Sequence, residues 1–144
     1  FVGNPVLLLD PPAVSAAIER VQKRTDALLN CGGTHPPEWF HRKLGDILYE
    51  GCGVAGDEAG LRDALTKVRE LREEFWRDVK VVGTGNRLNQ ELEKGGRVAD
   101  FIELGEVMIL DALDRRESAG AHFRNEYATE AGEAKRDEAS AAVL

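Results

Sequence analysis

Apolar residues recur along this chain at spacings of three and four, which is the period of an amphipathic α-helix. Four stretches show the pattern: one that starts after Asp10 and stops at Asn30, and then residues 36–49, 57–79 and 86–118. Prolines near the starts and glycines after the ends are typical of helix boundaries. Because the connections are short, the last three helices are expected to pack as an antiparallel bundle.

The boundaries and apolar stripes of these helices can be read residue by residue. Thr34 is expected to start the second helix, Asp57 the third and Asn86 the fourth. In the first helix, the stripe expected to pack beside the bundle consists of Val14, Ile18, Val21, Thr25 and Leu28. In the fourth, it consists of Leu88, Leu92, Val98 or Ala99, Ile102, Ile109 and Leu113. Glycines weaken a helix, so Gly95, Gly96 and Gly105 indicate a bend or a close approach by a neighbouring backbone.

The apolar period ends at Ser118, and the residues that follow mix glycine, alanine and charges of both signs. Phe123 and Tyr127 are the bulky anchors available to hold this segment in place. The predicted fold is therefore all-α: a three-helix antiparallel, spectrin-repeat-like bundle with an additional N-terminal helix and an irregular C-terminal tail. In domain terms, 1–33 is a linker or domain edge with one helix, 34–118 is the bundle, and 119–144 is the tail.

Composition narrows the class of protein. The chain has 144 residues, of which 42% are hydrophobic, enough for one core of ordinary domain size. The longest apolar stretch, Val6 to Leu9, is too short to cross a membrane. A net charge of −7 disfavours nucleic acid as a partner. Two cysteines, Cys31 and Cys52, supply no disulfide framework, so a cytoplasmic location is expected.

One stretch imitates a dinucleotide-binding fingerprint. From Val79 to Leu88, a strand-like run precedes Gly83, Gly85 and a helix start. Leu88 stands where the third glycine belongs, however, and Glu103 falls inside a helix rather than at the end of a second strand. An ordinary connection between helices is therefore the favoured interpretation.

The remaining candidates for chemistry are weak. His35, His41 and His122 are far apart in the sequence, and neither cysteine has metal-ligand spacing to any of them, so no metal site is predicted. Free cysteines are most often small apolar fillers, which leaves little support for a cysteine nucleophile paired with His41. No catalytic residue is assigned.

A dense cluster of charges follows the fourth helix, in the run Asp114-Arg-Arg-Glu-Ser-Ala-Gly-Ala-His-Phe-Arg124. The candidate interface residues in it are Arg116, Glu117, His122 and Arg124. Two interpretations remain open: termination of the helix, with Gly120 as the stop, or a contact with another domain or subunit. In the isolated domain these groups are expected to be hydrated.

This cluster and five other runs resemble the C-terminal helical domain of the flavoprotein subunit of succinate dehydrogenase and fumarate reductase. The runs are Phe40-His-Arg-Lys-Leu-Gly-Asp-Ile-Leu48, Leu71-Arg-Glu-Glu-Phe-Trp76, Leu88-Asn-Gln-Glu-Leu92, Gly96-Arg-Val-Ala-Asp-Phe-Ile-Glu-Leu-Gly-Glu106, Arg116-Glu-Ser-Ala-Gly-Ala-His122 and Gly132-Glu-Ala-Lys-Arg-Asp137. They occur in family order over about residues 36 to 138. The chain departs from the family at Ala119, where relatives usually carry Arg or Cys.

The resemblance implies a parent enzyme that interconverts succinate and fumarate through FAD. The cofactor and the dicarboxylate would be bound upstream of the matched region, so no cofactor is assigned to this fragment. The implied partners are the flavin domain of the same subunit, the iron–sulfur subunit and, indirectly, a membrane cytochrome b subunit, at the inner face of the cell membrane. Alternatives are an autonomous helical interaction module and the equivalent domain of L-aspartate oxidase. The isolated fragment is expected to form a homodimer or to have a partly disordered tail.

Overall fold

A computed structural model describes residues 11–53 and 55–137 of the chain. Four α-helices and one short 3₁₀-helix follow one another in this part: α1 (Pro11–Asn30), α2 (Pro37–Cys52), α3 (Glu58–Asp78), α4 (Gln90–Asp114) and η1 (Asn125–Tyr127). The extended pairings described are isolated bridges and not strands of a sheet. The predicted all-α class is confirmed.

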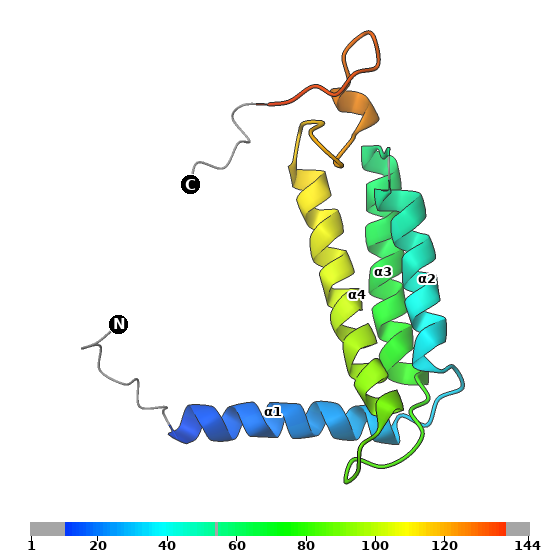
Figure 1. Ribbon diagram of the computed structural model, residues 1–144, viewed down its shortest axis with the longest axis vertical. Coiled ribbons are helices and arrows are strands. Elements are labelled where there is room, and N and C mark those ends of the chain that lie inside the picture. Colours follow the sequence, from blue (N-terminus) through cyan, green and yellow to red (C-terminus); the bar gives the residue numbers. More distant parts are fainter. Residues whose placement is uncertain (1–10, 54, 138–144) are drawn as a thin grey trace, which may run out of the picture.

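Helices α2, α3 and α4 stand side by side and alternate in direction, so they form the expected antiparallel bundle (Figure 1). Their inward faces bury a single apolar core, in which Phe40 and Phe75 meet edge to face with ring centroids 5.2 Å apart. The other fully enclosed apolar side chains include Leu61, Val68, Leu71, Val79, Ile102 and Ile109. Each comes from a position at helical spacing, which is why the pattern in the sequence predicts this part of the fold.

The helix starts only partly follow the predicted caps. Asp57, expected at the positive end of the third helix dipole, lies there and also caps α3, because its carboxylate accepts a hydrogen bond of 2.7 Å from the Gly60 amide. The cap of α4 is Asn89 and not Asn86: the Asn89 side chain accepts from the amides of residues 91 and 92, both at 3.1 Å. Thr34 caps no helix, since α2 starts after Pro36 without a side-chain cap.

Helix α4 spans 90–114, shorter than the predicted 86–118 at both ends. Leu88 therefore lies in the preceding loop, where it is 96% exposed instead of buried. The predicted close approach is confirmed at two glycines. A Cβ at Gly95 would lie 3.1 Å from the Val81 side chain, and one at Gly105 would lie 3.2 Å from the Leu44 side chain.

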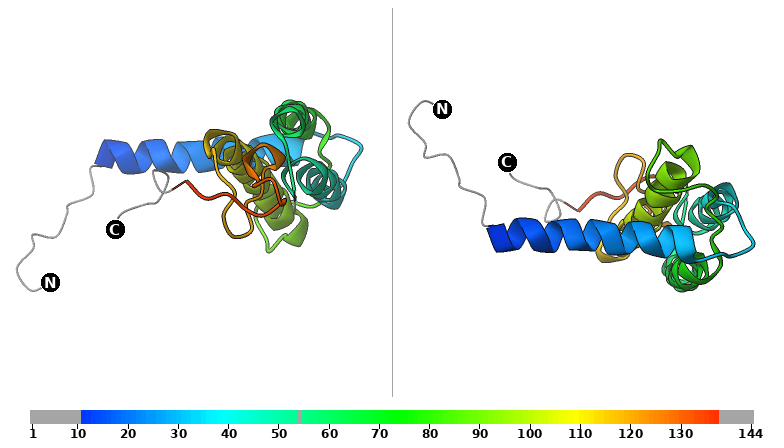
Figure 2. Two further views of the ribbon diagram at one scale, coloured as in Figure 1. Left: turned by 90° about the horizontal axis from the view of Figure 1, so that it is seen from above. Right: turned by 90° about the horizontal axis from the view of Figure 1, so that it is seen from below.

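Helix α1 differs most from its prediction. It crosses the foot of the bundle and projects away from it (Figures 1 and 2). Only its C-terminal end is anchored, by Leu28 in the core and by Arg24, which pairs with Asp100 of α4 at 2.5 Å. Of the rest of the predicted stripe, Thr25 is half-buried and three residues are exposed: Val14 by 37%, Ile18 by 53% and Val21 by 65%. The stripe exists, but the bundle does not cover it.

A polar clamp ties the connection between α1 and α2 to the end of α3. The Asp78 carboxylate accepts hydrogen bonds from the amide and hydroxyl of Thr34, and His35 Nδ1 lies 2.5 Å from Asp78 Oδ2. These hydrogen bonds lower the pKa of the Asp78 carboxyl to about 2, with His35 as the largest cause. At Gly33 the two backbones approach so closely that a Cβ would lie 1.9 Å from the Asp78 carbonyl oxygen.

Two glycines should respond in opposite directions to alanine. Nothing lies within 4 Å of a Cβ built at Gly45, so Gly45→Ala should stabilise the chain by about 0.5–1 kcal/mol, because alanine is the better helix former. Gly33→Ala must displace backbone and should destabilise it by about 1–3 kcal/mol. Urea unfolding measures both changes. Equal effects of the two substitutions would contradict the geometry.

The clamp should give the domain an acid-sensitive stability. The pKa of the Asp78 carboxyl is lower in the folded chain than its usual 3.8, so the ionised group stabilises the fold above about pH 4, and this is lost as the pH falls toward 2. Asp78→Asn should remove that part of the pH dependence. Thr34→Val should move it to higher pH, because one donor is lost. Thermal melts between pH 2 and 6 test this, and an unchanged slope in Asp78→Asn would exclude the clamp as its source.

Candidate functional site

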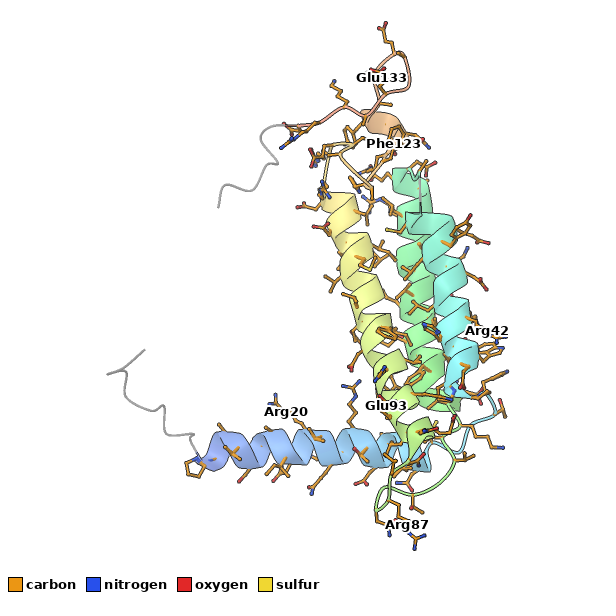
Figure 3. The ribbon with its side chains drawn as sticks, in the orientation of Figure 1. Arg20, Arg42, Arg87, Glu93, Phe123 and Glu133 are labelled. Atoms are coloured by element: carbon orange, nitrogen blue, oxygen red, sulfur yellow. The ribbon has the colours of Figure 1, made fainter. Side chains whose placement is uncertain are left out.

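The predicted charge cluster lies in the segment that follows α4, which folds over the end of the bundle opposite α1. Phe123 and Glu133 mark this segment in Figure 3. Backbone hydrogen bonds hold it to the connection before α3: the Gly56 amide donates to the Phe123 carbonyl, and the Asn125 amide donates to the Gly56 carbonyl. As far as residue 137, the tail lacks regular structure apart from η1, as expected, and its backbone is fixed by these pairings.

Arg124 holds the end of α4. Its side chain is only 3% exposed, and its Nη1 lies 3.1 Å from the Leu113 carbonyl oxygen, 3.3 Å from that of Arg115 and 3.5 Å from that of Ala112. The last carbonyls of a helix have no partner within the helix and carry its negative dipole end. A buried guanidinium satisfies both needs, so the helix ends at Asp114.

The buried charge of Arg124 is matched by acidic groups from the other side. Glu58 at the start of α3 lies 3.9 Å from its Nη2, and Glu126 lies 3.5 Å from its Nε. The Tyr127 ring lies 4.9 Å from the guanidinium carbon. Glu126 also accepts a hydrogen bond from the Glu58 amide, and this is the main cause of its lowered pKa. Arg124 thus connects α4, α3 and the tail.

Ser118 fixes the path between α4 and Arg124. Its hydroxyl, fully buried, donates to the Arg124 carbonyl at 3.1 Å and accepts from the Arg124 amide at 2.9 Å. The turn that this closes contains Gly120, whose φ of +60° favours glycine. Gly120 is therefore a turn residue six positions beyond the helix end and not the helix stop. Ser118 was not among the predicted site residues, although the glycine two positions after it does favour a turn.

Glu117 also points inward, with 4% exposure. Its carboxylate accepts hydrogen bonds from Arg115 at 2.7 Å and from the Asp137 amide at 3.1 Å, and these lower its pKa. The expectation of hydration is therefore wrong for Glu117 and Arg124. Both groups are bound inside the chain, because their partners are backbone groups and charges of the same domain.

The other two candidates lie differently. Arg116 is exposed and shares no hydrogen bond or ion pair with any residue of 11–53 or 55–137. His122 is half-buried, and its Nε2 is enclosed without a hydrogen-bond partner, beside a hollow of about 30 Å³ lined by Cys52, Gly56 and Arg124. Of the four residues, Arg116 is the exposed one.

The other chemical candidates serve the fold. Burial raises the pKa of the Cys52 thiol, which makes it a poorer nucleophile, and Cys31 lies 3.4 Å from the Trp76 carbonyl. The stretch with Gly83 and Gly85 is a loop between α3 and α4, as favoured above. Within 11–53 and 55–137, no three potential metal ligands gather, and no helix is long and apolar enough to cross a bilayer.

A feature that the sequence analysis missed is an apolar ridge on the outer side of α4. Its members, each between 41% and 60% exposed, are Phe101, Leu104, Val107, Met108 and Leu110. Between residues 101 and 110, α4 therefore carries apolar side chains outside the core as well as within it. The signal was present in the sequence, because this stretch has more apolar residues than one buried stripe requires.

The known proteins that this chain resembles are flavoprotein subunits of fumarate reductase or succinate dehydrogenase. A family model described as "Fumarate reductase flavoprotein C-term" matches residues 41–142. The fumarate reductase flavoprotein subunit of Haemophilus influenzae is 28% identical over 115 residues, 80% of this chain and 19% of that protein. The succinate dehydrogenase flavoprotein subunit of Bacillus subtilis is 24% identical over 112 residues, 78% of this chain and 19% of that protein.

Solved structures agree. A quinol fumarate reductase of E. coli superposes with a TM-score of 0.74 and 27% identity, over 96% of this chain and 22% of that one. The Sdh1 complex of Mycobacterium smegmatis gives a TM-score of 0.65 and 27% identity, over 78% of this chain and 19% of that one. The chain thus spans about a fifth of the length of the curated relatives that it matches.

Arg124 and Arg116 should differ in their effects on stability. Arg124→Met leaves three carbonyls without their charged donor and should destabilise the chain by about 2–3 kcal/mol, lowering Tm by about 5–10 °C. Arg116→Ala, at an exposed position without partners in the described chain, should change Tm by less than about 2 °C. Calorimetry of both variants measures this difference in Tm. A larger loss for Arg116→Ala than for Arg124→Met would refute the assignment.

Proposed function

Because the match over residues 41–142 shows that the chain belongs to the family of C-terminal domains of fumarate reductase flavoproteins, we propose that it is the helical support domain of such a subunit. The subunit would interconvert succinate and fumarate with FAD held in the domain that precedes this one. The relatives include both fumarate reductases and a succinate dehydrogenase, so the proposal covers either direction of the reaction.

The observation that carries the proposal is that sequence and fold both agree with this family over most of the chain. The family model covers 41–142, and the superposition with the fumarate reductase covers 96% of the chain. The polar groups best placed for chemistry are already used by the fold: Arg124 holds α4, Glu117 binds Arg115, and Asp78 holds the α1–α2 connection. A structural role accounts for each of them.

The contact with the iron–sulfur subunit is proposed for the end of the bundle where α4 meets its tail. Arg116 is exposed there and free to make bidentate hydrogen bonds to a carboxylate or backbone of a partner. Glu117, Arg124 and Ser118 support this role by fixing the loop that carries Arg116. The membrane cytochrome b subunit would be reached only through the iron–sulfur subunit, at the inner face of the cell membrane.

The proposal is tested by comparing the isolated chain with the intact subunit expressed from the uncut reading frame. The intact subunit should purify with FAD and with its iron–sulfur partner, whereas the 144-residue chain should show no flavin absorbance and no succinate oxidation. In the intact complex, Arg116→Ala should reduce retention of the iron–sulfur subunit about tenfold or more, because a buried interfacial charge would lose its partner.

Each arm has an outcome that contradicts it. Stoichiometric FAD in the isolated chain would reject the support role, as would an uncut reading frame without a flavin domain. Unchanged retention of the iron–sulfur subunit in Arg116→Ala, with FAD still bound, would reject only the contact assigned to this loop.

A further inference from the structure

An apolar groove runs between α2 and α4 on the outside of the bundle. Its floor is formed by Leu44, Leu48 and Gly105, and Leu104 and Met108 line one side. The volume is about 210 Å³. The rings of His41 and Phe101, whose centroids are 5.7 Å apart, separate it from a second hollow of about 220 Å³ nearer the foot of the bundle.

Gly45 lies in the middle of α2 at the side of this groove, and the fold of the chain does not require it. A Cβ built there meets no atom within 4 Å, whereas Cβ atoms at Gly95 and Gly105 would meet core side chains at 3.1 and 3.2 Å. Glycine is the least favourable residue for a helix interior apart from proline. An open helical glycine beside an apolar groove leaves room for close approach by a backbone from outside the described chain.

Five of the twelve large apolar side chains that are exposed in the described chain lie on α4. The groove continues onto the α4 ridge through Leu104 and Val107, which are 53% and 60% exposed. The junction of α3 and α4 is instead closed by ion pairs, in which Glu106 binds both Arg69 and Arg72. The ion-paired side is suited to contact with water. The exposed apolar surface that a partner would bury is therefore the α2–α4 groove with the α4 ridge.

The course of α1 indicates what covers the α2–α4 groove and the α4 ridge. The chain enters the bundle through α1, which extends from the foot on the side where α4 lies, and the views from above and below agree on this (Figure 2). The matched residues make up about a fifth of the length of these relatives and belong to their C-terminal part. Under the proposed function, the body of the subunit therefore joins at the free end of α1 and stands over α4.

We propose that the α2–α4 groove and the α4 ridge, centred on Gly45, Leu104 and Met108, are the seat of the preceding flavin domain of the same polypeptide, with a backbone segment of that domain lying against Gly45. This inference rests on the proposed function and adds to it the surface that is used. Val14, Ile18 and Val21, on the part of α1 that projects from the bundle, are also exposed.

The test places a carboxylate on two exposed positions on different sides of the bundle. Leu104→Glu lies within the proposed seat, and Thr66→Glu, on the exposed side of α3, is the matched control. In the isolated chain, both should change Tm by less than about 2 °C. In the intact subunit, Leu104→Glu should lower Tm by about 5–10 °C and speed proteolysis between the two domains, whereas Thr66→Glu should do neither.

Gly45→Ala adds a variant that cannot fail by unfolding. It should raise Tm of the isolated chain by about 2–4 °C and lower that of the intact subunit, because the added methyl group obstructs the seat. Equal shifts in both contexts, with FAD bound in the intact subunit, would overturn the seat and leave the proposed function standing. Loss of a homodimer of the isolated chain in Leu104→Glu, without effect in the intact subunit, would assign the surface to a second copy and overturn the proposal as well.

Discussion

The upper end of the domain depends on the buried guanidinium of Arg124. It satisfies carbonyls of Ala112, Leu113 and Arg115, which α4 leaves open, and its charge is opposed by Glu58 at the start of α3. A buried cation without these partners would be costly, so the contacts must form together. The end of α4, the start of α3 and the path of the tail are therefore one cooperative unit.

The sequence pattern predicts those helix bounds that are determined by interactions between residues close together in the chain. Helices α2 and α3 fall within a few residues of their expected bounds, because an apolar period of 3.6 and nearby caps such as Asp57 fix them. The bounds of α4 are less predictable, since Asn86 and Asn89 are equally good caps by residue type, and the distal end is set by Arg124, ten residues beyond it in sequence. The position of α1 is decided by what lies beside it, which its own stripe cannot reveal.

In the candidate site, too, the local sequence predicts some features and long-range contacts determine the others. Arg116, Glu117, His122 and Arg124 are close in sequence, but their direction follows from long-range partners: the Asp137 amide for Glu117 and the helix carbonyls for Arg124. Residue type alone indicates that such groups need partners, and it does not say whether these lie inside the chain. The α4 ridge was overlooked for a related reason, because a search for one stripe per helix stops once Ile102 and Ile109 account for the core.

The two ends of the bundle and its sides thus have different roles. The half-buried Asp78 carboxylate and the buried Arg124 Nη1 both find hydrogen-bond partners within the chain, although Arg124 Nε is enclosed without one. Leu104 and Met108 are exposed on α4, the helix whose C-terminal end Arg124 holds. A fixed apolar surface loses little conformational entropy when a partner covers it, which favours association at modest buried area. The Arg124 contacts therefore serve the interface indirectly, because they fix the C-terminal end of α4.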